Sequence, residues 1–247
     1  MRSAPGNDRV SVLDRLLAVV DAVRAADGSS NITGLAIATG IPKSTVSRLV
    51  GDLVRQRYLT REDGNVEIGL RLFELGARAD MPRRLGVVAM PVLAELYNAT
   101  GEHLNLAVQE GEDMLSVFSV QGRLCPAPSR AGVRVPSMTT ALGKAVLAFA
   151  EDDAVQTQAI AELDSRQRDI LEQEFHSIRS HGVALDRGDT FPGVVGVASP
   201  VLSADRVPVA AISAAGPMDD MNPERIAPLV RHAALVLTRR LAAEPPR

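Results

Sequence analysis

The sequence contains very little cysteine and no long apolar segment. Its single cysteine, Cys125, excludes an internal disulfide framework and any metal site built from several cysteines. No apolar run reaches the roughly 18 residues that a membrane-spanning helix requires. Residues 1–8 are polar and lack the apolar stretch of a signal peptide. We therefore expect a cytoplasmic protein that makes no use of a membrane.

The common catalytic motifs are missing as well. The sequence contains no phosphate-binding loop, no His-Glu-x-x-His pair and no Gly-x-Ser-x-Gly elbow. Its four histidines, His103, His176, His181 and His232, have no recognisable catalytic spacing to Cys125 or to a serine. These absences predict that the chain is not an enzyme and that it holds no metal or cofactor.

Positive charge is in slight deficit and is unevenly distributed along the chain. The formal net charge is −3, which argues against a protein that is basic throughout. Residues 1–78 contain 11 arginines or lysines against 9 acidic residues, whereas residues 79–247 contain 16 against 21. A mildly basic first third on an acidic remainder favours a protein that presents one end to DNA. The 247 residues, 46% of them apolar, suit two small domains with cores.

Three helical segments are predicted in the first third. Residues 9–26 follow Asp8, a suitable N-cap, and carry apolar residues at helical spacing. This apolar stripe comprises Val10, Leu13, Leu16, Leu17, Val20 and Val23. A short second helix follows with Thr33 as its expected N-cap, and Gly40 is placed to end it in the left-handed conformation. A third helix is expected over residues 42–56, opened by a proline.

The third helix has the division of faces that is typical of a helix-turn-helix. Its buried stripe is predicted to comprise Val46, Leu49, Val50 and Leu53. Residues 58–61 and 66–68 alternate like strands around Asp63-Gly64, which predicts a hairpin in the position of a wing. The expected DNA-contact residues are Thr33, Lys43, Ser44, Thr45, Ser47, Arg48, Arg61 and Asn65. Among them Arg48 is the expected base contact and Lys43 the expected phosphate contact. The alternative is that the hydroxyl residues only face solvent.

The remaining two thirds predict an α+β domain. Helices are expected over residues 82–101, 142–150, 152–163, 166–181 and 223–242. Strands are expected over residues 104–109, 114–120, 183–185, 194–202 and 207–215. Two strands, then helices, then three strands and a final helix indicate an antiparallel sheet covered by helices.

Several motifs occur in a fixed order over the whole chain. In the first third they are residues 41–49 (Ile-Pro-Lys-Ser-Thr-Val-Ser-Arg-Leu), Tyr58-Leu59 and residues 68–76 (Ile-Gly-Leu-Arg-Leu-Phe-Glu-Leu-Gly). Further along they are residues 139–145 (Thr-Thr-Ala-Leu-Gly-Lys-Ala), 178–187 (Ile-Arg-Ser-His-Gly-Val-Ala-Leu-Asp-Arg) and 211–217 (Ala-Ile-Ser-Ala-Ala-Gly-Pro). Together they resemble the IclR family of regulators over residues 10–240, which is more specific than any single motif.

The resemblance implies both a fold and a function. It implies a winged helix-turn-helix DNA-binding domain over residues 8–77, a linker over 78–83 and a GAF-like effector-binding domain with an antiparallel sheet over 84–243. The implied function is transcriptional repression on a palindromic operator in double-stranded DNA, controlled by a small-molecule effector such as a carboxylate or an aromatic acid. We expect a homodimer or homotetramer, with the apolar stripe of residues 9–26 as a dimer contact.

The resemblance also implies an effector pocket. Carried over position by position, its residues are Val135, Ala141, Asp186, Gly196, Ser213 and Ala215. The backbone amides of Leu142, Gly143 and Lys144, at a helix start, are expected to receive a carboxylate. For Asp186 the alternative is a turn residue that bonds nearby amides, and for Ser213 it is a buried hydroxyl bonded to a carbonyl.

This chain departs from the family pattern around that pocket. Met138 stands in place of the usual histidine, and Gly188 and Asp189 in place of the usual acidic residues. Ala215 stands where serine is common, and Gly196 where cysteine or another small residue is common. Two alternatives therefore remain open: a dimeric DNA-binding regulator without a ligand, and a redox-responsive regulator that uses Cys125. The second would need a positive charge near the thiol, such as Arg123 or Arg130.

Overall fold

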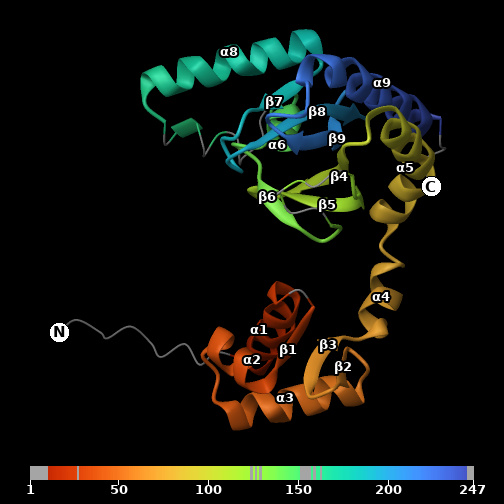
Figure 1. Ribbon diagram of the computed structural model, residues 1–247. Helices are drawn as coiled ribbons and strands as arrows, with labels where there is room; N and C mark the ends of the chain where they lie inside the picture. The colour runs from red at the N-terminus through yellow and green to blue at the C-terminus, as the bar shows by residue number, and fades with distance from the viewer. Residues whose placement is uncertain are drawn as a thin grey trace. The chain divides into compact units, whose positions relative to one another are not determined.

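The computed structural model describes residues 11–26, 28–122, 125, 127, 130–150, 157, 160–161 and 163–243, with only the backbone described for residues 80–83. The chain divides into two compact units, residues 1–83 and residues 84–247, and each is described by itself (Figure 1). Among the described helices, none is both long and apolar enough to cross a membrane.

The N-terminal unit consists of three helices, a small sheet and a short final helix. In chain order they are α1 (Val12–Ala25), β1 (Ser29–Asn31), α2 (Ile32–Thr39), α3 (Lys43–Arg55), β2 (Leu59–Glu62), β3 (Asn65–Ile68) and α4 (Leu70–Gly76). The antiparallel sheet has the order β1-β3-β2. Its core comprises Val19, Val23, Leu35, Val46, Leu49, Val50, Leu59 and Val66. The predicted winged helix-turn-helix is confirmed.

Two turns fix this topology, and both use left-handed residues. Gly40 ends α2 with a φ of 67°, as predicted. Asp63 and Gly64 both have positive φ, 48° and 82°, between β2 and β3. Two successive residues of this kind form the turn whose twist matches a two-residue hairpin. The wing is therefore determined by local sequence.

The helix starts differ from the prediction. Asn31, not Thr33, caps α2, because its Oδ1 accepts a hydrogen bond of 2.8 Å from the amide of Gly34. Thr33 lies in the first turn of that helix. Helix α1 begins at Val12, where Ser11 and Asp14 form a reciprocal capping box. The predicted cap Asp8 lies outside the described residues.

The predicted apolar stripe of α1 is only partly buried. Of the predicted residues, Val23 is fully buried, Leu16 and Val20 are half-buried, and Leu13 and Leu17 are 62% and 53% exposed, whereas Val10 lies outside the described residues. Val19, which the prediction left out, is also fully buried. Residues 19 and 23 are one helical turn apart, so α1 contacts its own core along a narrow line. The exposed leucines lie towards the N-terminal end of the helix and leave an apolar surface uncovered within this unit.

The C-terminal unit is the predicted α+β domain. Its helices are α5 (Asp80–Thr100), α6 (Ala141–Leu147), α8 (Ser165–His181) and α9 (Pro223–Ala242). Its strands are β4 (His103–Glu110), β5 (Asp113–Val120), β6 (Arg134–Pro136), β7 (Ala184–Asp186), β8 (Val194–Leu202) and β9 (Pro208–Pro217). They form one antiparallel sheet in the order β6-β5-β4-β9-β8-β7.

Helices cover both faces of this sheet. On one face α5 and α9 pack on large apolar residues such as Leu104, Val197 and Ile212. On the other face α6 and α8 pack on smaller residues such as Ala198 and Ala211. Because side chains alternate along a strand, each strand contributes to both cores. The small residues on the α6 face matter for the site described below.

Two helix boundaries in this unit differ from the prediction, and one strand was missed. Helix α5 begins at Asp80, inside the segment expected as a linker, and α6 ends at Leu147 rather than at residue 150. Strand β6 was expected to be loop, because three residues give no periodicity. Most of the helix predicted over residues 152–163 lies outside the described residues.

Candidate functional site

The first candidate site is the outer face of α3. Val46, Leu49 and Val50 are buried in the core, as predicted, so the opposite face is directed outward. That face exposes Lys43, Ser44, Ser47 and Arg48, whereas Thr45 is half-buried. Within the described part of the chain, neither Lys43 nor Arg48 forms an ion pair. Both cations are thus available to an anionic partner.

The wing and the start of α2 carry the other predicted DNA contacts. Arg61 lies on β2 and Asn65 begins β3, and both side chains are exposed. Thr33 is exposed in the first turn of α2. These residues belong to the same compact unit as α3, and their contact with DNA remains a prediction.

The second candidate site lies on the α6 face of the large sheet. Asp186 is paired with Gly196, Gly196 with Ala215, and Ala198 with Ser213. Directly opposed residues of antiparallel strands share a face, so these side chains lie together. A Cβ added to Gly196 would lie 3.7 Å from the Cβ of Ala141. The structure therefore brings five of the predicted pocket residues together, and Val135 packs against the same cluster.

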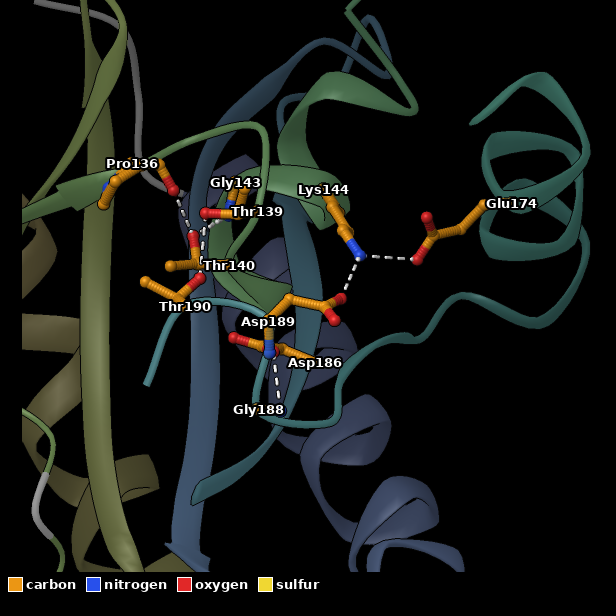
Figure 2. Close-up of polar contacts among 10 residues, drawn as sticks. All are labelled: Pro136, Thr139, Thr140, Gly143, Lys144, Glu174, Asp186, Gly188, Asp189 and Thr190. Atoms are coloured by element: carbon orange, nitrogen blue, oxygen red, sulfur yellow. Dashed lines mark hydrogen bonds and ion pairs between the residues drawn. The ribbon is translucent and has the colours of Figure 1, made fainter. Parts of the chain in front are cut away.

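The start of α6 does not offer the three free amides that the sequence suggested. The amide of Gly143 donates to Thr140 Oγ1 at 3.2 Å, and the amide of Lys144 donates to the Thr140 carbonyl at 3.0 Å (Figure 2). Thr140 is the N-cap and in turn donates to the carbonyl of Pro136. The cap and the first helical turn therefore already use the amides of Gly143 and Lys144, and the expected carboxylate contact, which also included Leu142, stays a prediction.

Asp186 serves in the turn that follows β7. Its Oδ1 accepts hydrogen bonds from the amides of Gly188 at 3.1 Å and Asp189 at 2.9 Å. This is the turn role that the sequence left open as an alternative. Only one of the two carboxylate oxygens takes part, so the side chain retains an acceptor on the α6 face.

The same turn is tied to α6 and α8 by side chains (Figure 2). The ammonium group of Lys144 lies 3.0 Å from a carboxylate oxygen of Glu174 on α8 and 3.4 Å from one of Asp189. Thr190 Oγ1 donates to Thr139 Oγ1 at 2.8 Å. Lys144 is only 9% exposed, so this lysine links three segments at the edge of the site from a largely buried position.

Replacing Lys144 with methionine should lower the free energy of unfolding of the C-terminal unit by about 1–2 kcal/mol. The two carboxylates would lose their shared partner, but both keep some contact with water, which limits the loss. Urea unfolding of the full chain measures it. Arg134→Met is the matched control, because Arg134 pairs with Glu110 in an exposed position and should lose less than about 1 kcal/mol. Equal losses in both variants would contradict a special role for Lys144.

Sequence reasoning missed a polar row on β4 and β5. His103 is paired with Ala215 and Asn105 with Ser213, which places both on the face of the predicted pocket. Ser119 Oγ lies 3.1 Å from His103 Nε2. Burial lowers the pKa of His103, and the hydrogen bond with Asn105 opposes this only in part. The signal was present as polar residues alternating with Leu104 and Leu106, but nothing showed which strand lies beside β4.

Cys125 is described with only some of its chain neighbours, and Arg123, one of the two positive charges named for the redox alternative, lies outside the described residues. The side chain of Cys125 is partly buried, and burial, with a contribution from the nearby Glu102 carboxylate, raises the pKa of the thiol. A raised pKa disfavours the thiolate, which is the reactive form. This observation argues against the redox alternative.

The chain is similar to known regulators over almost its whole length. It is 26% identical over 236 residues to the transcriptional repressor IclR of Escherichia coli (strain K12), covering 91% of this chain and 86% of that protein. It is 25% identical to the glycerol operon regulatory protein of Streptomyces coelicolor, covering 95% and 97%. A crystal structure of an IclR homologue from Microbacterium hydrocarbonoxydans in complex with 4-hydroxybenzoate superimposes with a TM-score of 0.83, at 25% identity, covering 95% of this chain and 100% of that one.

Family models match both units. The model of the IclR helix-turn-helix domain matches residues 12–63, within the unit that contains α3 and the wing. The model described as the C-terminal domain of the bacterial transcriptional regulator IclR matches residues 83–239, which is more than half of the chain. The resemblance found in the sequence is confirmed. The protein belongs to the IclR family of bacterial transcriptional regulators.

Proposed function

We propose that this protein is a transcriptional repressor that binds a palindromic operator in double-stranded DNA through α3 and the wing. The observation that carries the proposal is the outward face of α3, where two exposed serines and two cations without an ion-pair partner among the described residues stand opposite a buried apolar stripe. Such a helix places its N-terminal residues against base edges and phosphates in the major groove. Repression is supported by the Escherichia coli relative, which is described as a repressor.

A homodimer, paired into a tetramer, suits this role. A palindromic operator has two half-sites, and a two-fold symmetric protein presents one DNA-binding unit to each. Helix α1 exposes Val12, Leu13 and Leu17, each more than half accessible, and these residues form the proposed dimer contact.

The proposed effector is a small molecule that binds on the α6 face of the C-terminal sheet, within residues 84–243. A carboxylate or an aromatic acid is supported by the 4-hydroxybenzoate complex of the Microbacterium homologue. The effector regulates the protein only if it binds more tightly to one arrangement of the DNA-binding units than to the other. The proposed location of the protein is the cytoplasm, where it would bind its operator.

The first experiment is to capture sheared genomic DNA of the source organism with the purified protein and to sequence what is retained. Enrichment of a palindromic site beside one operon supports the repressor, and the reactions of that operon indicate the class of effector. Absence of enrichment at both moderate and low salt argues against the DNA-binding proposal.

Replacing Lys43 with alanine should weaken binding to all DNA sequences and reduce the slope of log affinity against log salt by about one unit. The reason is that one phosphate contact, and the counterion it displaces, would be lost. Fluorescence anisotropy over a salt series measures the slope. Arg166→Ala, an exposed arginine at the start of α8, is the control and should leave the slope unchanged.

The effector site is tested by Ser213→Phe, which would fill the space beside Gly196 and Ala215. The variant should still bind the operator, but the effector that the operon identifies should no longer change this binding. Ala204→Phe, at an exposed position between β8 and β9, is the matched control. An unchanged response in Ser213→Phe would remove this pocket and favour a regulator without a ligand.

A further inference from the structure

A cavity of about 390 Å³ lies in the N-terminal unit at the base of the wing. Its walls come from the C-terminal end of α3, from β2, from the end of β3 and from the start of α4 (Figure 1). The apolar part of the lining consists of Val54, Leu59, Ile68 and Leu70. A cavity of this volume with a mainly apolar lining and a few polar groups is typical of a site for a small molecule.

Close backbone packing fixes the floor of this cavity. The amide of Gly69 donates to the carbonyl of Tyr58 at 2.8 Å. A Cβ added to Gly69 would approach the carbonyl oxygen of Arg57 much more closely than the 3.0 Å that real Cβ atoms keep. Leu59 belongs to the core and is only 1% exposed. The cavity is therefore a preformed feature of the fold, because its floor cannot move without disturbing the sheet and its core.

Arg71 is the polar residue with the most unusual surroundings in this lining. Its guanidinium carbon lies 5.3 Å from the centroid of the Tyr58 ring, which is a favourable position for a cation. Its Nε is buried and has no hydrogen-bond partner among the described residues. No carboxylate in the described part of the chain forms an ion pair with Arg71 either. Because a guanidinium shares its charge over three nitrogens, an anion on the two terminal nitrogens would offset the cost of burying the third.

The charges around the cavity favour an anionic ligand. Arg57 is a second cation in the lining, and Glu74, one helical turn after Arg71, is the one carboxylate. Two cations and one carboxylate give these lining residues a net charge of +1. A phosphate group has no apolar part that could cover the apolar side chains. An aromatic carboxylate fits both parts of the lining, because its ring is apolar and its carboxylate pairs with a guanidinium.

We propose that this cavity is a second ligand site of the protein and that it binds a small aromatic carboxylate. The ring lies among the apolar side chains, and the terminal nitrogens of Arg71 donate to the two carboxylate oxygens. Because α4 begins at the cavity, the bound molecule holds the start of α4 against the wing and the end of α3. The site belongs to the DNA-binding unit and does not depend on the effector pocket proposed for the C-terminal unit.

The test compares two probes of the same shape, naphthalene-2-carboxylate and the neutral naphthalene-2-methanol. Both are titrated into the full chain carrying Ser213→Phe, so that the proposed C-terminal pocket is filled. The chain contains no tryptophan, so the emission of the naphthalene ring reports binding directly. We expect the carboxylate to bind about tenfold more tightly than the alcohol, the effect of one charged hydrogen-bonded pair.

Hydrogen exchange of the unmodified chain locates the bound probe. A ligand that binds only the folded state slows exchange in the unit that holds it. The carboxylate should therefore slow exchange in peptides from residues 11–76. Slower exchange confined to residues 84–243 would assign the probe to the C-terminal unit and overturn the inference.

Two variants connect the preference to the cavity. Arg71→Met keeps a long apolar stem but removes the charge, so the carboxylate should lose its tenfold advantage. Arg55→Met is the matched control and should retain it, because Arg55 is an exposed arginine of α3 that already pairs with Asp52 at 2.6 Å. Thr60→Phe, at an exposed position of β2 that lines the cavity, should block both probes and is compatible with a strand.

Equal binding of the two probes, or a preference that survives in Arg71→Met, overturns the inference. Binding of neither probe overturns it as well, and is the result expected if a second copy of the chain covers the cavity. Operator capture is measured without any probe, so a failure of the proposed repressor function would be seen separately from a failure of this site.

Discussion

Replacing Gly143 with alanine is expected to destabilise the C-terminal unit by about 3 kcal/mol, a large part of the stability of a domain of this size. A Cβ added at this glycine would collide with the backbone of Ser137, closer than the 3.0 Å that real Cβ atoms keep. The backbone of Ser137 cannot yield easily, because its amide is bonded to the carbonyl of Glu112 and the next residues cap α6. The collision therefore has to be relieved by moving the helix.

The measurement is urea unfolding followed by circular dichroism, with Gly51→Ala as the control. Gly51 lies in α3, where an added Cβ meets nothing within 4 Å. That control should gain about 0.5–1 kcal/mol, because alanine favours a helix more than glycine does. If Gly143→Ala unfolds at the same urea concentration as the unmodified chain, the close approach of α6 to residue 137 is wrong.

Gly143 also shows what the motif at residues 139–145 does in this chain. The sequence suggested that this segment presents amides to a ligand, whereas the cap at Thr140 and the contact at Ser137 give it a structural role. Capping residues and anion-binding amides have the same local sequence pattern, a hydroxyl residue before a helix. Only the contacts of the cap distinguish the two.

Elements with their own periodicity could be predicted well. The buried stripe of α3 and the hairpin turn at Asp63-Gly64 follow from residues that lie close in sequence. Strand β8 was predicted with the bounds that the structure has, Val194–Leu202, because a long apolar run allows few alternative positions for the ends of a buried strand. In these cases the local pattern and the tertiary packing favour the same structure.

Elements that depend on a distant partner could not be predicted. Strands β1 and β6 have three residues each and exist because β3 and β5 pair with them. The same limit applies to the site: alternation indicates which residues of β4 share a face, but not that Asn105 is paired with Ser213, more than 100 positions away. Register between distant strands is a property of the folded sheet and is not encoded in either strand alone.

Replacing Leu35 with alanine is expected to unfold the N-terminal unit selectively, with a loss of about 2–5 kcal/mol. Leu35 on α2 is fully buried against α1 and α3, and its removal leaves a cavity in a core of only a few side chains. The cores of the two units share no buried residue, so the C-terminal unit should keep its stability. Operator affinity should fall with the folded fraction of α3, even though Leu35 contacts no DNA.

The matched control is Ile37→Ala on the same helix, because Ile37 is 79% exposed and its removal should change stability by less than about 0.5 kcal/mol. Hydrogen exchange followed by mass spectrometry separates the two units, since peptides from residues 11–76 and 84–243 are read independently. Faster exchange confined to the first range is the expected result for Leu35→Ala. An equal increase in both ranges would mean that the two units unfold together. DNA binding and effector binding could then not be assigned to units that fold independently.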